Sequence, residues 1–140
     1  LPWIASIDKF QHWIYENPSH TIEQRYDKWE EIAREFGTGQ VDHSGLENSL
    51  RRSWQAQLHL YEVPFYYIEY GMAQLGAIAV WRNYKQDPGK ALKQYSDALA
   101  LGYTTTIGEI YRTAGIKFDF SDTYVKELAE FVKEELDKLD

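Results

Sequence analysis

A histidine and three tyrosines near the middle of the chain have side chains that could take part in a reaction. They are His59, Tyr66, Tyr67 and Tyr70. An imidazole and a neutral phenol can both donate hydrogen bonds to a reacting group. No Gly-x-Ser-x-Gly motif, Walker loop or dinucleotide fingerprint accompanies them, and nothing obvious supplies a nucleophile. The sequence therefore predicts one part of an active site.

The tyrosines belong to a segment that is predicted to form a buried helix beginning at Pro64. Proline fits the first turn of a helix, where its missing N–H costs nothing. From Val63 to Trp81 the only formal charge is that of Glu69, and a helix that is apolar around its circumference is normally covered by neighbours on all sides. A buried polar group without a partner costs about 1–3 kcal/mol, and the sequence assigns Glu69 no partner.

Helical spacing from Pro64 brings the three phenols together. At about 100° per residue, Tyr66 and Tyr70 lie one turn apart, and Tyr67 lies at the edge of the same face. The histidine is predicted to lie on a preceding helix, separated from the tyrosines by a bend at Pro64. The alternative interpretation is an ordinary core helix whose hydroxyls are satisfied by water.

Composition favours a globular protein that does not bind nucleic acid. The chain has 140 residues, a net charge of -7 and no basic cluster, whereas nucleic-acid binding depends on Lys and Arg that neutralise phosphates. The absence of cysteine excludes disulfides and thiolate metal ligands and slightly favours the cytoplasm. The most apolar segment contains Glu69, Gln74 and several tyrosines, so we expect no helix in a membrane.

No metal site is predicted within the chain. The His-Glu-x-x-His motif of zinc peptidases is absent; in that motif, two histidines at i and i+4 bind the metal from one face of a helix. The histidines of this chain lie in different segments, and no two have that spacing. They are His12, His20, His43 and His59.

The remaining sequence indicates an all-α helical bundle of about seven helices that forms a single domain over residues 1–140. Several helix starts carry capping signals, such as Thr21 and the Asp-Pro pair at 87–88. Ser44 is expected to cap a helix that continues to Tyr61. The predicted helices cover residues 4–16, 21–36, 44–61, 64 onward, 88–101, 106–114 and 121 onward.

Three runs of sequence resemble the C-terminal part of the oligoendopeptidase F family, which belongs with thimet oligopeptidase among the zinc metallopeptidases that cut short peptides. The runs are residues 1–15 (LPWIASIDKFQHWIY), 59–74 (HLYEVPFYYIEYGMAQ) and 114–121 (AGIKFDFS), and the likeness extends over essentially all 140 residues. The resemblance implies a large helical catalytic domain with a deep channel. In that family the zinc is held by a His-Glu-x-x-His motif and a downstream glutamate, and these ligands are expected upstream of this chain. The chain opens on Leu1 without an initiator methionine, so we expect it to be a fragment.

The resemblance also implies roles for the central residues. His59, Tyr67 and Tyr70 match the family's histidine and paired tyrosines, which face the zinc from the opposite wall of the channel, and Tyr66 is a further substrate-binding candidate. These groups would bind the peptide backbone and stabilise the oxyanion that forms when zinc-bound water attacks the scissile carbonyl.

We therefore expect the C-terminal part of a cytoplasmic zinc metalloendopeptidase that hydrolyses oligopeptides. The chain by itself is expected to bind no zinc, to hydrolyse nothing, and to form a homodimer that covers an exposed apolar face. The alternative is a non-catalytic, all-helical module that binds peptides or another protein in an aromatic groove. An upstream reading frame that carries the zinc motif would exclude the alternative.

Overall fold

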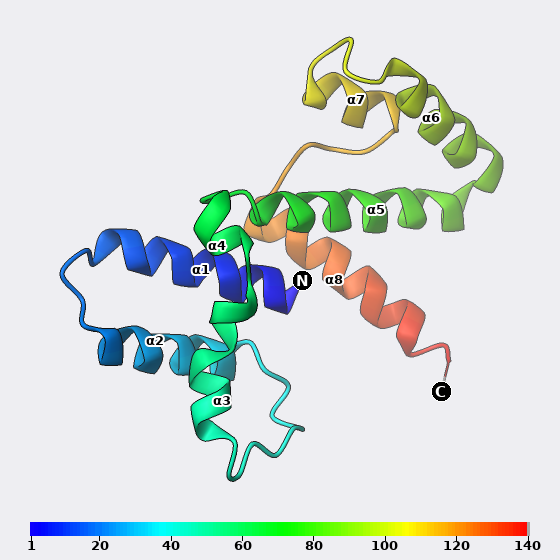
Figure 1. The fold of residues 1–140 in the computed structure, drawn as a ribbon. Helices are drawn as coiled ribbons and strands as arrows, with labels where there is room; N and C mark the ends of the chain where they lie inside the picture. Colours follow the sequence, from blue (N-terminus) through cyan, green and yellow to red (C-terminus); the bar gives the residue numbers. More distant parts are fainter. Residues whose placement is uncertain (140) are drawn as a thin grey trace. The chain divides into compact units, whose positions relative to one another are not determined.

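The computed structural model describes residues 1–139, and within them the chain forms eight α-helices, one 3-10 helix and no β-strand (Figure 1). The all-α prediction is confirmed. Over the same residues, no helix combines the length and the apolar character that crossing a bilayer requires. The elements are α1 Pro2–Glu16, α2 Ile22–Glu35, α3 Glu47–Arg52, η1 Ser53–Ala56 (the 3-10 helix), α4 His59–Glu62, α5 Ile68–Gln86, α6 Pro88–Leu101, α7 Ile107–Thr113 and α8 Asp122–Leu136.

Four of these helices begin close to their predicted starts, and each has a capping side chain there. The hydroxyl of Thr21 accepts a hydrogen bond from the backbone N–H of Gln24 at 3.2 Å, and the Gln24 side chain accepts one from the Thr21 N–H at 2.8 Å. This reciprocal pair is a capping box. Asp87, Thr106 and Ser121 cap α6, α7 and α8 with their side-chain oxygens.

The predicted helix over residues 44–61 is wrong, because the chain forms α3, η1 and α4 there. Ser44 does not cap α3; its backbone N–H and its hydroxyl both donate to the Asp42 carboxylate, at 2.9 and 2.6 Å. Those bonds hold the pKa of Asp42 below its usual value. Gly45 follows with φ +79°, a left-handed conformation that does not continue a helix.

The fold contains two compact units, Leu1–Gly71 and the segment from Met72 onward. The core of the first unit comes from α1, α2 and η1, and its buried residues are Ile7, Phe10, Trp29, Ile32 and Trp54. Phe10 packs edge to face on Trp29, at 5.1 Å between ring centroids, and lies tilted against Trp54 at 5.4 Å. The single domain over residues 1–140 stays a prediction.

The second unit packs the later part of α5 with α6, α7 and α8. Its buried residues include Ala79, Tyr124 and Leu128. The hydroxyl of Tyr111 donates to the Met72 carbonyl at 3.3 Å and lies directly over Gly76, where an added Cβ would stand 3.0 Å from the phenol oxygen. Gly76 therefore allows Tyr111 to approach the α5 backbone closely.

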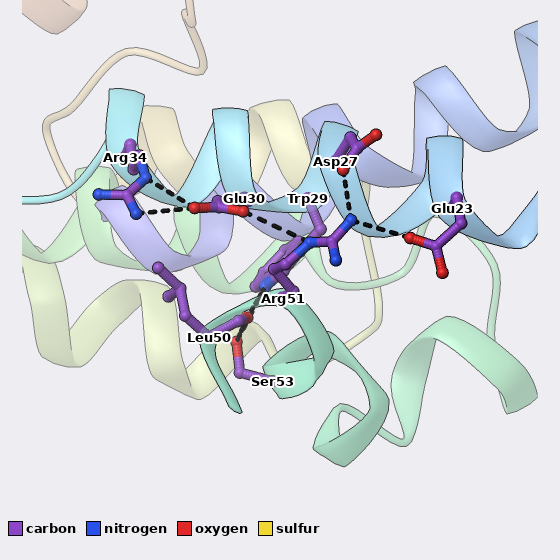
Figure 2. A network of polar contacts seen from close by, with 8 residues as sticks. All are labelled: Glu23, Asp27, Trp29, Glu30, Arg34, Leu50, Arg51 and Ser53. Atoms are coloured by element: carbon purple, nitrogen blue, oxygen red, sulfur yellow. Dashed lines mark hydrogen bonds and ion pairs between the residues drawn. The ribbon is translucent and has the colours of Figure 1, made fainter. Parts of the chain in front are cut away.

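The indole of Trp29 anchors the turn between α3 and η1 to α2. Its Nε1–H donates to the Leu50 carbonyl at 3.0 Å and to Ser53 Oγ at 2.9 Å (Figure 2). The Ser53 hydroxyl donates in turn to the Leu50 carbonyl at 2.9 Å. Because Trp29 is 0% exposed, its N–H needs these protein partners.

Arg51 ties α3 to three carboxylates of α2. Its guanidinium contacts Glu23 at 3.1 Å, Asp27, and Glu30 at 3.5 Å, and Arg34 holds Glu30 from within α2 at 2.7 Å (Figure 2). The hydrogen bonds to Asp27 and Glu23 raise the pKa of Arg51. The end of α3, and therefore the segment that leads to His59, is held against α2.

Candidate functional site

The four side chains singled out in the sequence lie together in the first unit. The ring of His59 lies 4.9 Å from Tyr67, 5.7 Å from Tyr70 and 6.3 Å from Tyr66 between centroids. Tyr70 in turn lies 5.1 Å from Tyr67 and 5.9 Å from Tyr66. We refer to His59, Tyr66, Tyr67 and Tyr70 as the His–Tyr cluster. Its members therefore share one small region of the unit. The sequence predicts that the three phenols come together, and the structure adds His59 beside them.

The position of His59 depends on η1. Trp54 in η1 is 5% exposed and packs in the core, beside Phe10. The next turn is closed by the backbone N–H of Gln57, which donates to the Trp54 carbonyl at 3.0 Å. The Gln57 carbonyl then accepts from the Leu60 N–H at 3.1 Å, at the start of α4. His59 is the first residue of α4, so a buried tryptophan and two backbone bonds fix its place.

The tyrosines reach the cluster by a different route from the predicted one. α5 begins at Ile68, so the predicted helix start at Pro64 is wrong. The reason is Phe65, whose φ of 60° is left-handed and interrupts a helix. The buried side chain of Gln11 in α1 holds this conformation, since its Oε1 accepts from the Phe65 N–H at 2.9 Å.

Tyr66 and Tyr67 therefore precede α5, and only Tyr70 lies in its first turn. The Tyr66 carbonyl accepts from the Glu69 N–H at 3.0 Å and the Tyr67 carbonyl from the Tyr70 N–H at 3.3 Å. These bonds connect the irregular segment to the helix. The phenols converge because the chain turns before Ile68, where the Tyr66 N–H donates to the Val63 carbonyl at 3.2 Å, and not because of helical spacing alone.

Exposure divides the cluster into a supporting part and an accessible part. Tyr67 is partly buried and packs against the core of the first unit. Tyr66 is 44% exposed and Tyr70 is 46% exposed, so the expectation of a helix covered on all sides is wrong at its start. Glu69 is exposed as well, which explains why its charge needs no protein partner. Tyr66 and Tyr70 are free to meet another molecule.

Hydrogen bonds link His59 to residues on both sides. Its Nε2 lies 3.3 Å from the Tyr70 hydroxyl oxygen, and its Nδ1 lies 2.7 Å from Gln57 Nε2. Gln57 Oε1 accepts from the indole N–H of Trp3 at 3.2 Å. Trp3 and Gln57 were not predicted as site residues, because no local signal identifies a contact between residues 54 positions apart.

The described residues, 1–139, include no group of three or more His, Cys, Asp or Glu side chains placed to hold a metal ion. The other histidines have structural neighbours. The His12 ring lies tilted against Phe65, at 4.9 Å between centroids, and faces Asp8 at 3.5 Å. His20 accepts from the Nε of Arg25 at 2.7 Å. The side chains of residues 1–139 therefore include no donor set that fits a zinc ion.

Two solved structures are similar to this chain over nearly its whole length. A solved structure provisionally named oligoendopeptidase F matches 99% of this chain with a TM-score of 0.84 and 32% identity, over 25% of its own length. A structure of PZ peptidase A with an inhibitor matches 100% of this chain with a TM-score of 0.87 and 30% identity, also over 25% of its own length. The chain thus spans about a quarter of each of these solved relatives.

A comparison with curated proteins gave no match. The profile of peptidase family M3 matches residues 1–130. This match covers nearly the whole chain and agrees with both structural relatives, and it confirms the resemblance on which the sequence analysis relied. The chain belongs to peptidase family M3.

Proposed function

We propose that this chain is the C-terminal part of a zinc-dependent oligopeptidase, in which the His–Tyr cluster binds the substrate and stabilises the transition state. His59, Tyr67 and Tyr70 are the proposed catalytic groups, and Tyr66 is a further substrate-binding group. Membership of peptidase family M3 supports the reaction class. The observation that carries the proposal is the contact of His59 Nε2 with the Tyr70 hydroxyl, at 3.3 Å, beside two half-exposed phenols.

The chemistry of these side chains suits peptide hydrolysis. Attack on a peptide carbonyl places negative charge on its oxygen, and a donor that is already aimed at that oxygen stabilises the charge. A phenol remains neutral near physiological pH and still donates a hydrogen bond. Tyr70 offers such a donor at the surface of the cluster, and Tyr66 offers a second one to the peptide backbone.

Zinc belongs to the proposal for the parent protein and not to this chain, because the described residues do not fit a metal ion. In the parent protein, a zinc ion held by residues outside this chain would supply Lewis-acid chemistry. We propose that the isolated chain binds no zinc, hydrolyses no peptide and forms a homodimer through its exposed apolar face. We also propose that the parent protein acts on oligopeptides in the cytoplasm.

Kinetics of the intact parent enzyme test the role of the cluster. Tyr70→Phe removes one donor and keeps the ring, so we expect kcat to fall about 100- to 1000-fold while KM changes little, because the contact matters mainly in the transition state. Tyr103→Phe is the matched control, since Tyr103 is fully exposed. An unchanged kcat in Tyr70→Phe would remove Tyr70 from the mechanism.

A further inference from the structure

Gln57 lies between Trp3 and His59 and contacts both through its side-chain amide. The amide oxygen is 3.2 Å from the indole Nε1 of Trp3, and the amide nitrogen is 2.7 Å from Nδ1 of His59. On the far side of the imidazole, Nε2 is 3.3 Å from the Tyr70 hydroxyl. Four side chains thus form one continuous chain of hydrogen bonds.

The donor and acceptor types of these side chains fix the direction of each hydrogen bond in the series. An indole N–H only donates, so the Gln57 atom that faces Trp3 must be the oxygen. The amide NH₂ therefore faces His59 and donates to it, which requires Nδ1 to be an acceptor without a proton. A neutral imidazole carries its proton on one nitrogen only, so the proton of His59 lies on Nε2, where it is donated to the Tyr70 oxygen.

We infer that Trp3 and Gln57 are positioning residues, which hold His59 as the neutral Nε2–H tautomer so that Tyr70 accepts from His59 and directs its own O–H away from it. The role of that O–H as a donor to a peptide rests on the proposed function. The assignment of the His59 tautomer does not rest on the proposed function, because it follows from the contacts within the first unit.

Both positioning residues are supported by the core of the first unit. The Trp3 ring meets the buried Trp29 ring edge to face, at 5.6 Å and 86°. Gln57 is fixed at the end of η1 by the bond from its own N–H to the Trp54 carbonyl, at 3.0 Å. Two core tryptophans therefore orient the amide, and the amide orients the imidazole. Such second contacts commonly select the tautomer of a functional histidine.

Nitrogen NMR of the 140-residue chain tests the inference directly. Long-range ¹H–¹⁵N spectra distinguish a protonated ring nitrogen from a bare one, and measurement at about pH 8 keeps ordinary histidines neutral. We expect His59 to show a protonated Nε2 and a bare Nδ1, with the exposed His12 as an internal reference. A proton on Nδ1 of His59 in the unmodified chain would overturn the inference.

Two substitutions test the direction of the hydrogen bonds from Trp3 through Gln57 to His59. Gln57→Glu keeps the shape and the acceptor for Trp3 but replaces the NH₂ donor with an acceptor, so we expect a proton to move onto Nδ1. Trp3→Phe removes only the indole donor, so we expect the amide to turn freely and the two tautomers to become mixed. If Nδ1 stays bare in Gln57→Glu, the amide does not select the tautomer and the inference is wrong.

Gln55→Glu is the matched control, because Gln55 is an exposed residue of the 3-10 helix that Gln57 follows. It adds the same charge two positions away, and we expect it to leave the His59 tautomer unchanged. The same change in both variants would show a general charge effect and would contradict the inference. No substrate is involved, so these results stand apart from the Tyr70→Phe kinetics that test the proposed function.

Discussion

The side-chain oxygen of Gln11 accepts a hydrogen bond from the backbone N–H of Phe65 at 2.9 Å, across 54 positions of sequence. Gln11 is 2% exposed, and Phe65 has a φ of 60°. A bulky residue in the left-handed region is strained and persists only where its surroundings enforce it. This one bond links α1 to the segment that carries Tyr66 and Tyr67. It supports the conformation of Phe65 that prevents a helix from starting at Pro64.

Replacing Gln11 tests that link. Gln11→Leu leaves the Phe65 N–H without its acceptor, and we expect the free energy of unfolding to fall by about 1–2 kcal/mol in urea titrations. Gln74→Leu is the control, because Gln74 is exposed on α5, and its effect should stay within about 0.5 kcal/mol. Equal effects of the two substitutions would show that the bond to Phe65 has no special weight.

The glycines of α5 and α7 should respond in opposite ways to alanine. A Cβ added at Gly108 would meet open space, with no neighbouring atom of the described residues within 4 Å, so Gly108→Ala should raise the free energy of unfolding by about 0.5 kcal/mol through helix propensity. Gly76→Ala should lower it by about 1 kcal/mol, because the new Cβ would lie 3.0 Å from the Tyr111 hydroxyl oxygen. In a Tyr111→Phe background that oxygen is gone, but two ring carbons remain 3.3 and 3.4 Å from the added Cβ, so Gly76→Ala should cost less than in the unmodified chain.

Tyr111 should make the second unit sensitive to alkaline pH. Burial raises the pKa of Tyr111 above its ordinary value of 10.0, with a smaller contribution from Tyr124. The folded chain therefore retains the phenol proton at pH values where the unfolded chain has lost it. Stability is unaffected below about pH 10 and falls as the pH rises through the folded pKa. Urea titrations at about pH 8.5 and 10.5 should show a smaller loss for Tyr111→Phe than for the unmodified chain.

The control for this experiment is Tyr103→Phe, which removes a fully exposed phenol. Its alkaline loss should equal that of the unmodified chain. If Tyr111→Phe loses as much stability as Tyr103→Phe between the two pH values, burial of the Tyr111 phenol does not contribute.

Arg51 should contribute to the first unit in a way that depends on salt. Its guanidinium meets Glu23, Asp27 and Glu30, and such a network outweighs a single surface pair. Arg51→Met should lower the urea midpoint, and the difference should shrink when NaCl is raised from about 0.1 M to about 1 M, because salt screens exposed charges. Arg112→Met should have little effect at either concentration, since the Arg112 side chain is 72% exposed and pairs with Glu109 alone among the described residues. An effect of Arg112→Met as large as that of Arg51→Met would contradict this expectation.

Local signals predicted the helices whose ends depend on nearby residues. Thr21 and Ser121 cap α2 and α8 from their own sequence neighbourhood, so reading the sequence is enough to place them. Pro64 carried an equally clear local signal and misled, because the conformation of Phe65 depends on Gln11 in another helix. Ser44 misled for a nearer reason, since Asp42 takes its hydroxyl.

The candidate site shows the same division. His59 and the tyrosines stand out by type and spacing, and the family resemblance assigned them roles that stay predictions. The convergence of the three phenols was predicted from helical geometry, and it occurs through an irregular segment. Trp3 and Gln57 could not be identified, because an exposed tryptophan and a glutamine in the first unit carry no signature until the fold brings them together.

Tyr66 and Tyr67 lie on irregular backbone, whereas Tyr70 lies in the first turn of α5. Changes in chain length should therefore affect Tyr70 differently on the two sides of Ile68. Each residue of a helix turns the next by about 100°, so a length change after Ile68 would rotate Tyr70 to another face. An insertion or deletion within residues 63–67 would leave Tyr70 on the same face of α5. Insertions and deletions between the histidine and the last tyrosine therefore belong before Ile68, and homologues can vary there without reorienting the phenol that meets the imidazole.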